Sequence, residues 1–296
     1  MKRIASHAGS WYSNIPEKLN QELSSNLQLA EKYLTKPIPG ARALIGPHAG
    51  YAYSGPTAAY AYACINPDPI KRVFLLGPSH HTYLEGCALS KFKSYETPLG
   101  DLSVDTQVSK ELFDTGVFGW MPPSVDVNEH SLELHLPFIA KIFENKLDDI
   151  TLVPVLVGSL QVEEEKAYGK IFAKYLNDPT SLFIISSDFC HWGKRFGYTY
   201  CPPTPESTPI HAAISELDHQ AMALIESLNL DDFAAYLAKT KNTICGRHPI
   251  GILMGAVAHL NETLSPNIKF VKYAQSNPCK TLADSSVSYA SAYLYF

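Results

Sequence analysis

The chain has 296 residues, of which 46% are hydrophobic and 18% charged, and its formal net charge is −5. This length supports a sizeable hydrophobic core, and the acidic balance argues against nucleic acid as a partner, because phosphate backbones are bound by basic surfaces. We see neither a signal peptide nor an apolar stretch long enough for membrane insertion. We therefore expect a cytoplasmic protein, with the nucleus as a second compartment.

The six cysteines stand at wide, irregular spacings without a Cys-x-x-Cys pair. A structural zinc cluster is therefore not expected. Reduced thiols are the default in a cytoplasmic chain, and most of these cysteines should be small buried hydrophobes.

Hydrophobic periodicity predicts helices and strands in alternation. In chain order, we expect a helix over 14–34, a strand over Ala43–Gly46, a helix over Gly55–Ile65, a strand over Arg72–Leu76, a short helix over Ser109–Thr115, a strand over Ile150–Val157, a helix over Glu163–Leu176, a strand over Leu182–Ser186, two helical segments within Ile210–Leu237, a helix over Pro249–Leu260 and a strand over Ser286–Phe296. Pro154 should bend its strand or place it at a sheet edge.

This alternation predicts an α/β fold with a central mixed, largely parallel sheet. The apolar runs lack polar alternation, as expected of strands that are covered on both faces. We expect a single domain over residues 1–296, because candidate site residues stand on both sides of the one possible boundary. That boundary, CPPTPESTP at 201–209, is interpreted as a surface loop.

Three predicted strands run into short polar turns that carry histidine. The turns read GPHAG with His48, GPSHH with His80 and His81, and SSDFCHWG with Asp188 and His191. In open α/β sheets, ligands bind beyond the carboxyl ends of the strands. The sequence therefore predicts a site where these turns meet, although a single such histidine would more often just hydrogen-bond a neighbouring loop.

Two metal chemistries fit these residues. Two histidines with a carboxylate, here His48, His80 and Asp188, form the facial triad typical of non-haem iron. Histidines with a cysteine thiolate favour copper or zinc instead. Cys245 is the candidate thiolate, because it should precede a helix that begins at Pro249 and stands near Arg247, and both features favour loss of the thiol proton.

The stretch VNEHSLELHLPFI adds His130, Glu133 and His135. In a helix or in a strand, His130 and His135 point in different directions, so they should not chelate one ion together. We interpret His130 and Glu133 as groups that line the pocket or support the site. An ordinary helix start with an acidic first turn is the alternative.

Taken together, the motifs ASHAGSWY, PHAGYAYSG, LGPSHH, EHSLELHLPF, VPVLVG, SSDFCHWG, TICGRHPIG and YAQS, followed by DSSVSYA, resemble the Memo family, mediators of cell motility downstream of receptor tyrosine kinases. The resemblance runs from residue 5 to near the C-terminus. It implies a three-layer αβα sandwich similar to class III extradiol dioxygenases, which use non-haem iron.

The resemblance also implies a ligand set and a cofactor. The metal ligands would be His48, His80 and Cys245, with Asp188 and His191 beside them, and His191 would match the acid/base histidine of the dioxygenases. Apart from the resemblance, we expect His81, His130 and Glu133 to surround this site, because metal-bound histidines usually need an oriented partner. Copper is the implied ion, with iron as the second, and redox activity or copper sequestration as the implied role. A carboxylate stands in the dioxygenases where this pattern has a thiolate, so catechol cleavage is only an analogy of fold.

Three hypotheses follow from these residues. The first is a redox metal protein that is open to oxygen or to a small oxidisable substrate, which would make it a metal-dependent oxidoreductase. The second is a non-catalytic signalling adaptor that binds phosphopeptides, with Arg195 and Arg247 near the site turns as phosphate partners. The third is a thiol enzyme in which Cys245 is the nucleophile and His191 or His248 the base.

Overall fold

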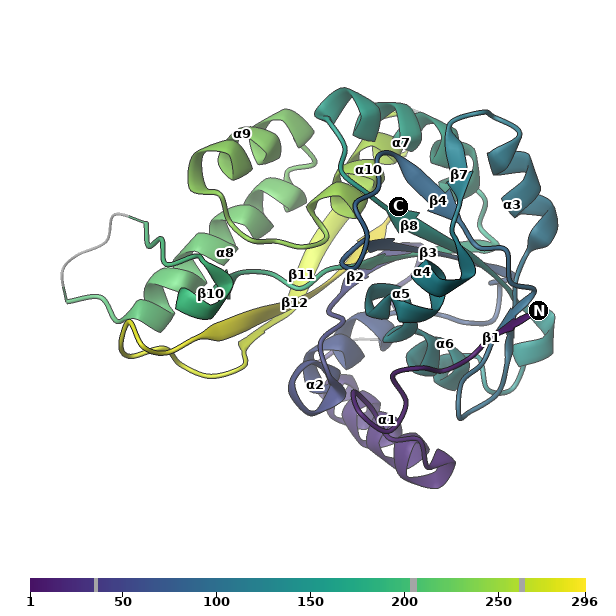
Figure 1. Ribbon diagram of the computed structural model, residues 1–296, viewed down its shortest axis with the longest axis horizontal. Coiled ribbons are helices and arrows are strands. Elements are labelled where there is room, and N and C mark those ends of the chain that lie inside the picture. Colours follow the sequence, from purple (N-terminus) through teal and green to yellow (C-terminus); the bar gives the residue numbers. More distant parts are fainter. Residues whose placement is uncertain (35–36, 203–206, 261–263) are drawn as a thin grey trace.

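The computed structural model describes residues 1–34, 37–202, 207–260 and 264–296. It is a mixed α/β structure in which helices cover both faces of a large mixed sheet, as expected for a three-layer sandwich (Figure 1). No helix in this part of the chain combines the length and the apolar character needed to span a bilayer. Residues 203–206 of the expected surface loop lie outside the described residues.

The large sheet has the strand order β10-β12-β2-β9-β3-β8-β4-β7, and β11 pairs with β12 beside this path. At its centre β2, β9, β3 and β8 are mutually parallel, whereas β12 and β4 flank them in antiparallel orientation. The strands of this sheet are β2 (Ala41–Gly46), β3 (Arg72–Pro78), β4 (Cys87–Leu89), β7 (Phe118–Trp120), β8 (Thr151–Val157), β9 (Ser181–Ser186), β10 (His191–Trp192), β11 (Asn267–Gln275) and β12 (Ser286–Tyr295). A small separate sheet joins β1 (Lys2–Arg3), β5 (Ser94–Tyr95) and β6 (Leu102–Ser103).

The helices form two layers (Figure 1). On one face α1, α2 and α6 pack together, and on the other α7 packs against α10. The helices are α1 (Pro16–Glu31), α2 (Tyr51–Tyr62), α3 (Thr106–Phe113), α4 (Pro123–Asn128), α5 (His130–Glu133), α6 (Leu136–Ile142), α7 (Val162–Leu176), α8 (Ile210–Glu226), α9 (Leu230–Thr240) and α10 (Arg247–Val257), with 3₁₀ turns η1 (Leu147–Asp149) and η2 (Lys194–Phe196).

Alternate residues of the central strands enter two separate hydrophobic cores. In β9, Phe183 and Ile185 pack in the core that contains α7 and α10, whereas Leu182 and Ile184 pack in the core that contains α1, α2 and α6. Because successive side chains of a strand point to opposite faces, a strand that is apolar at every position requires a helical layer on each side. The uninterrupted apolar runs of the sequence therefore dictate the sandwich.

The predicted elements are confirmed in type, but some details differ. Pro154 is expected to bend its strand or to place it at a sheet edge, and the edge position is wrong, because β8 lies inside the sheet between β3 and β4. The β4 ladder reaches only Val155–Val157, and Pro154 pairs with Leu75 of β3 alone. Because β4 is short, Pro154 has a ladder partner on only one side, as in an edge strand, and proline is tolerated at such a position.

Helix α2 begins at Tyr51, four residues before the predicted start at Gly55, and contains Pro56. The first four backbone N–H groups of a helix have no partner within it. A proline at the sixth position therefore removes only one intrahelical hydrogen bond, and the helix tolerates it there.

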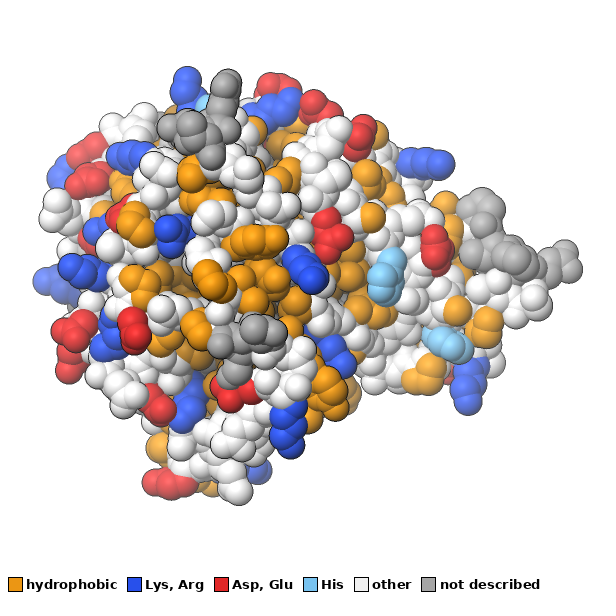
Figure 2. All heavy atoms as spheres, turned by 180° about the vertical axis from the view of Figure 1, so that it is seen from behind, with side chains coloured by type: hydrophobic (Ala, Val, Ile, Leu, Met, Phe, Trp, Pro, Cys, Tyr) orange, Lys and Arg blue, Asp and Glu red, His pale blue; other side chains and the backbone are white. Residues whose placement is uncertain are grey.

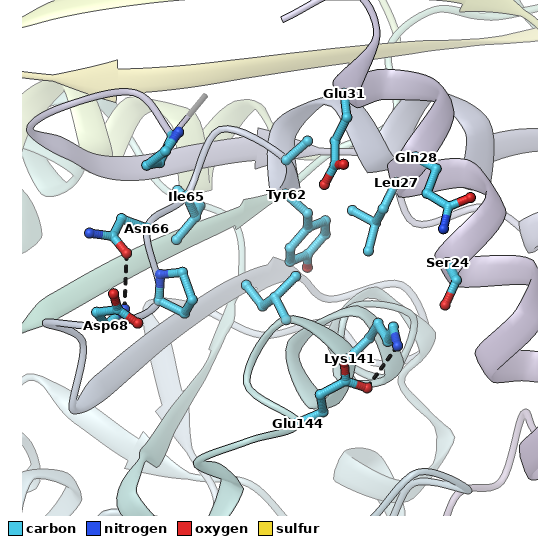
Figure 3. A pocket seen from close by; sticks show the side chains of 14 residues that line it. Ser24, Leu27, Gln28, Glu31, Tyr62, Ile65, Asn66, Asp68, Lys141 and Glu144 are labelled. Carbon is cyan, nitrogen blue, oxygen red and sulfur yellow. Dashed lines mark hydrogen bonds and ion pairs between the residues drawn. The ribbon is translucent and has the colours of Figure 1, made fainter. Parts of the chain in front are cut away.

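The surface carries hydrophobic side chains near the middle of its rear face, among scattered charges of both signs (Figure 2). A groove of about 680 Å³ runs between the ends of α1, α2 and α6, with Leu27, Tyr62 and Lys141 among its lining residues (Figure 3). It shares no lining residue with the cavity that contains the histidines.

Candidate metal centre

The carboxyl ends of three adjacent parallel strands form the base of the site. The second residue after each strand is polar: His48 follows β2, Asp188 follows β9 and His80 follows β3. The order β2-β9-β3 and the pairing of Gly46 with Ser186 bring these ends together. The predicted convergence of the three turns is therefore confirmed.

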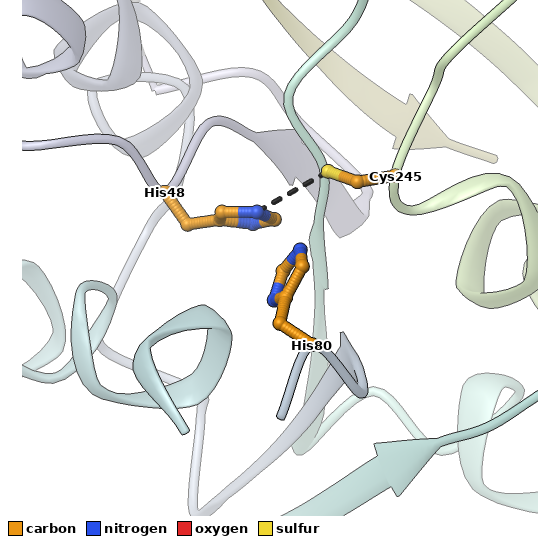
Figure 4. Close-up of side chains that lie close together, drawn as sticks. All are labelled: His48, His80 and Cys245. Carbon is orange, nitrogen blue, oxygen red and sulfur yellow. Dashed lines mark hydrogen bonds between the residues drawn. The ribbon is translucent and has the colours of Figure 1, made fainter. Parts of the chain in front are cut away.

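The ligand atoms of His48, His80 and Cys245 all lie within 4.8 Å of one another (Figure 4). The Cys245 Sγ is 3.2 Å from His48 Nε2, and the rings of His48 and His80 have their centroids 5.1 Å apart. A cation that binds sulfur at about 2.3 Å and imidazole nitrogen at about 2.0–2.1 Å needs donors at such separations. These three residues can therefore hold one metal ion.

The loop before α10 carries Cys245 into the site through a close backbone contact. A Cβ atom on Gly246 would lie 2.3 Å from the carbonyl oxygen of Ser186 and 2.3 Å from the Cβ of Ser187, so only glycine fits there. The backbone N–H of Gly246 also donates to Ser187 Oγ at 3.0 Å. The loop is thereby fixed against the end of β9.

Hydrogen bonds fix which nitrogen of His48 faces the site. The Ser186 hydroxyl donates its single hydrogen to the carbonyl oxygen of Ser131, 2.7 Å away. It must therefore accept from His48 Nδ1, which lies 2.6 Å from it, because a hydroxyl has only one hydrogen to donate. Nε2 of His48 then presents its lone pair toward Cys245. Burial, followed by the neighbouring histidines, keeps the pKa of His48 well below 6.5, so the ring is neutral.

Glu129 plays the same role for His80. Its Oε1 accepts from His80 Nδ1 at 2.9 Å and its Oε2 accepts from the His80 backbone N–H at 2.7 Å. Burial alone would raise the pKa of Glu129, but these hydrogen bonds outweigh it and the pKa lies well below 4.5. A carboxylate that holds the far nitrogen of a histidine is the usual support of a metal ligand.

His191 is oriented by backbone carbonyls. Its Nδ1 lies 2.9 Å from the carbonyl oxygen of Phe189 and 3.1 Å from that of Thr243. Both are acceptors, so Nδ1 carries the hydrogen and Nε2 is left with a lone pair in the neutral ring. The Thr243 hydroxyl also accepts from the His191 backbone N–H at 2.7 Å. His191 lines the same cavity as His48 and His80.

Asp188 is buried beside His48, His80 and Cys245 but lies outside both groups of candidate metal ligands among the described residues. Its Oδ1 accepts from the backbone N–H of His48 at 2.9 Å. Burial raises the pKa of its carboxyl group. The geometry thus places the thiol, and not this carboxylate, together with the two imidazoles.

The expected activation of Cys245 by the helix and by Arg247 is wrong. Burial, with the charge of Asp188 second, raises the pKa of the Cys245 thiol. Arg247 is exposed, so water screens its charge. Helix α10 also begins at Arg247, two residues before the predicted start at Pro249. The thiol therefore keeps its proton at neutral pH unless a cation displaces it.

The histidine cavity has a volume of about 390 Å³. Besides the site residues, it is lined by Trp11, Tyr53, Arg195 and Phe196. Arg247 and His248 line a different, smaller cavity, which Cys245 also lines. Of the two predicted phosphate partners, only Arg195 therefore reaches the histidine cavity.

Of the other predicted site residues, His130 and His81 lie at or next to the histidine cavity, whereas Glu133 points away from it. His130 lines the cavity with its ring stacked on His80 at 4.3 Å, and the exposed His81 lies with Nε2 3.4 Å from His130 Nδ1. The Glu133 carboxylate turns instead to the N-terminal segment, where it binds Arg3 Nη1 at 2.7 Å and Tyr12 OH at 2.9 Å.

Sequence reasoning missed the groups that orient the site histidines, namely Glu129 for His80, Ser186 for His48 and Thr243 for His191. Glu129 stands directly before His130, and the sequence offers no means of choosing between it and Glu133. Ser186 is the last residue of β9, where a small polar residue is unremarkable. Only the side-chain directions reveal these partners.

Comparison with known proteins identifies relatives along nearly the whole chain. The family model described as Memo-like protein matches residues 3–293. Protein MEMO1 of Xenopus laevis is 50% identical over 293 residues, which cover 99% of this chain and 97% of that protein. Human Protein MEMO1 is 47% identical with the same coverage, and the Protein memo-1 homolog of Caenorhabditis elegans is 47% identical over 99% of this chain and 82% of its own length. The chain therefore belongs to the Memo family.

Proposed function

We propose that this protein holds one copper ion through His48, His80 and Cys245, with iron as the alternative metal. The observation that carries the proposal is the convergence of two imidazole nitrogens and a sulfur within 4.8 Å. A set of two histidines and one cysteine is soft enough to favour copper. Bound there, the ion would supply one-electron redox chemistry, or would be sequestered.

The surrounding residues have separate tasks. Glu129 and Ser186 hold His80 and His48 with their far nitrogens hydrogen-bonded, so that each ring offers a lone pair to the ion. His191, which has a free Nε2, accepts or returns a proton of a substrate in the cavity. The 390 Å³ volume admits a small oxidisable molecule. We regard the chain as a single Memo-like domain over 1–296, located in the cytoplasm and also in the nucleus.

Metal stoichiometry tests this proposal. The full chain is equilibrated with copper under reducing conditions, and bound metal is measured for the wild type, His48→Ala and Cys245→Ser. We expect each variant to bind one copper ion fewer than the wild type. Cys201→Ser is the matched control, because Cys201 is a free and partly buried cysteine outside the candidate ligand groups. Unchanged binding in both site variants would refute the ligand assignment.

A second candidate function is a phosphopeptide adaptor, which the position of Arg195 in the histidine cavity favours. A guanidinium group at a cavity wall pairs readily with phosphate. Binding of a phosphotyrosine peptide and of its unphosphorylated counterpart would be compared in the wild type and Arg195→Ala. Absence of binding at micromolar concentration would reject this function.

The thiol-enzyme hypothesis receives less support. The pKa of the Cys245 thiol is raised by burial, so the nucleophilic form is scarce at neutral pH. His248 is engaged through Nδ1 with Glu165 Oε1 at 2.6 Å, and it lines the smaller cavity. Activity that survives complete removal of metal would favour this hypothesis again.

A further inference from the structure

A second pair of histidines lies beside the three proposed copper ligands: His130 lines the histidine cavity, and His81 is its neighbour. His81 is exposed, and its Nε2 is 3.4 Å from Nδ1 of His130. His130 in turn lies between the His80 ring, at 4.3 Å between centroids, and the Trp11 ring, at 4.6 Å. This sandwich holds His130 in place, whereas His81 is open to solvent.

The separation of these two nitrogens is long for a hydrogen bond but suits two ligands of one ion. Hydrogen bonds donated by N–H groups typically span about 2.7–3.2 Å. Two imidazole nitrogens bound at about 2.05 Å and at a tetrahedral angle are about 3.3–3.4 Å apart. The observed 3.4 Å matches the second geometry.

Glu129 supplies charge at the same point. Its Oε1 lies 3.5 Å from His130 Nδ1 while also accepting from His80 Nδ1 at 2.9 Å. His80, Glu129 and His130 form a second group whose ligand atoms all lie within 4.8 Å of one another. The carboxylate therefore favours a cation beside His130 without leaving His80.

We propose that His81 and His130, supported by the charge of Glu129, form a second, outer cation site that takes a divalent ion of the zinc and copper class. The two imidazoles provide the bonds, and water completes the coordination on the exposed side of His81. The ion would lie at the edge of the histidine cavity, next to its lining residue His130. This outer site does not require the inner copper centre to exist.

Zinc alone is the probe. The full chain is dialysed against Zn²⁺, and bound zinc per chain is measured for the wild type and three variants. His81→Ala changes an exposed residue, and His130→Phe keeps a ring between Trp11 and His80, so neither should disturb the fold. Each should bind one zinc ion fewer than the wild type, and Cys245→Ser should separately lose the inner ion.

His219→Ala is the matched control, because His219 is an exposed histidine outside both candidate ligand groups, and it should leave the zinc content unchanged. Wild-type zinc content in either His81→Ala or His130→Phe would overturn the outer site. If these two variants lose zinc and Cys245→Ser does not, the outer site stands and the proposed inner centre fails.

Discussion

Acidification should weaken the fold through His135, an imidazole that is completely enclosed. Its Nδ1 is 2.7 Å from the Tyr62 hydroxyl, and its buried Nε2 has no hydrogen-bond partner among the described residues. Burial lowers the pKa of His135 from 6.5 to about 3. Between these two values the unfolded chain binds a proton that the folded protein excludes.

The sign and size of the effect follow from this difference. Because the folded pKa is depressed, the stability is fully present above pH 6.5 and is lost as the pH falls toward 3. At 1.36 kcal/mol per pKa unit, moving from pH 7 to pH 4.5 costs about 2.5 kcal/mol of unfolding free energy. The cost hardly depends on the folded pKa, since at pH 4.5 the folded ring is still neutral.

Urea unfolding at pH 7 and pH 4.5 measures this cost. His135→Gln removes the titrating group and keeps a polar side chain. Its unfolding free energy should therefore decrease less on acidification than that of the wild type, and the difference between the two losses should be about 2.5 kcal/mol. His219→Gln, at an exposed position, should behave as the wild type does. Equal losses in the wild type and His135→Gln would refute the reasoning, whatever their stabilities at pH 7.

Three further perturbations test the support of the site and the packing of the fold. Glu129→Gln keeps an acceptor for His80 but removes its charge, so metal affinity in a chelator competition should fall about 10- to 100-fold; an unchanged affinity would contradict the supporting role. Arg3→Met leaves Glu133 buried without its cation, so urea unfolding should show a loss of about 3–5 kcal/mol in unfolding free energy. A loss below about 1 kcal/mol, typical of exposed ion pairs, would show that the Arg3–Glu133 pair contributes little. Gly169→Ala would bring a Cβ to 2.4 Å from the backbone of Gly255, where α7 packs against α10. Thermal unfolding should therefore show a loss of about 1–3 kcal/mol in unfolding free energy, despite the better helix propensity of alanine. A higher melting temperature would show that the two helices can separate freely.

The location of the site could be predicted from the sequence because it depends on topology. His48, His80 and Asp188 each follow an apolar run, and parallel strands that alternate with helices must end at one edge. No knowledge of side-chain directions is needed for this step. Cys245 follows no strand, so the residues alone left it as an alternative to Asp188, and only the family resemblance chose it for the ligand set.

The supporting groups could not be predicted, because they depend on where each side chain points. Glu129 and Glu133 stand four residues apart, yet one holds His80 and the other holds Arg3 of the N-terminal segment. The prediction that Cys245 loses its proton was wrong for a related reason. A helix start and a nearby arginine are visible in a sequence, whereas the burial that outweighs them is not.

The hydrogen bonds around the cavity favour a cation over an anion as its occupant. His48, His80 and His191 use three different acceptors, a hydroxyl, a carboxylate and backbone carbonyls, and yet all three donate from Nδ1. In its neutral form, each ring then offers a lone pair through Nε2, which an anion cannot use. A phosphate would find Arg195 at the wall but imidazole lone pairs beyond it. A metal ion satisfies these lone pairs and, by displacing the proton of Cys245, gains a thiolate as well.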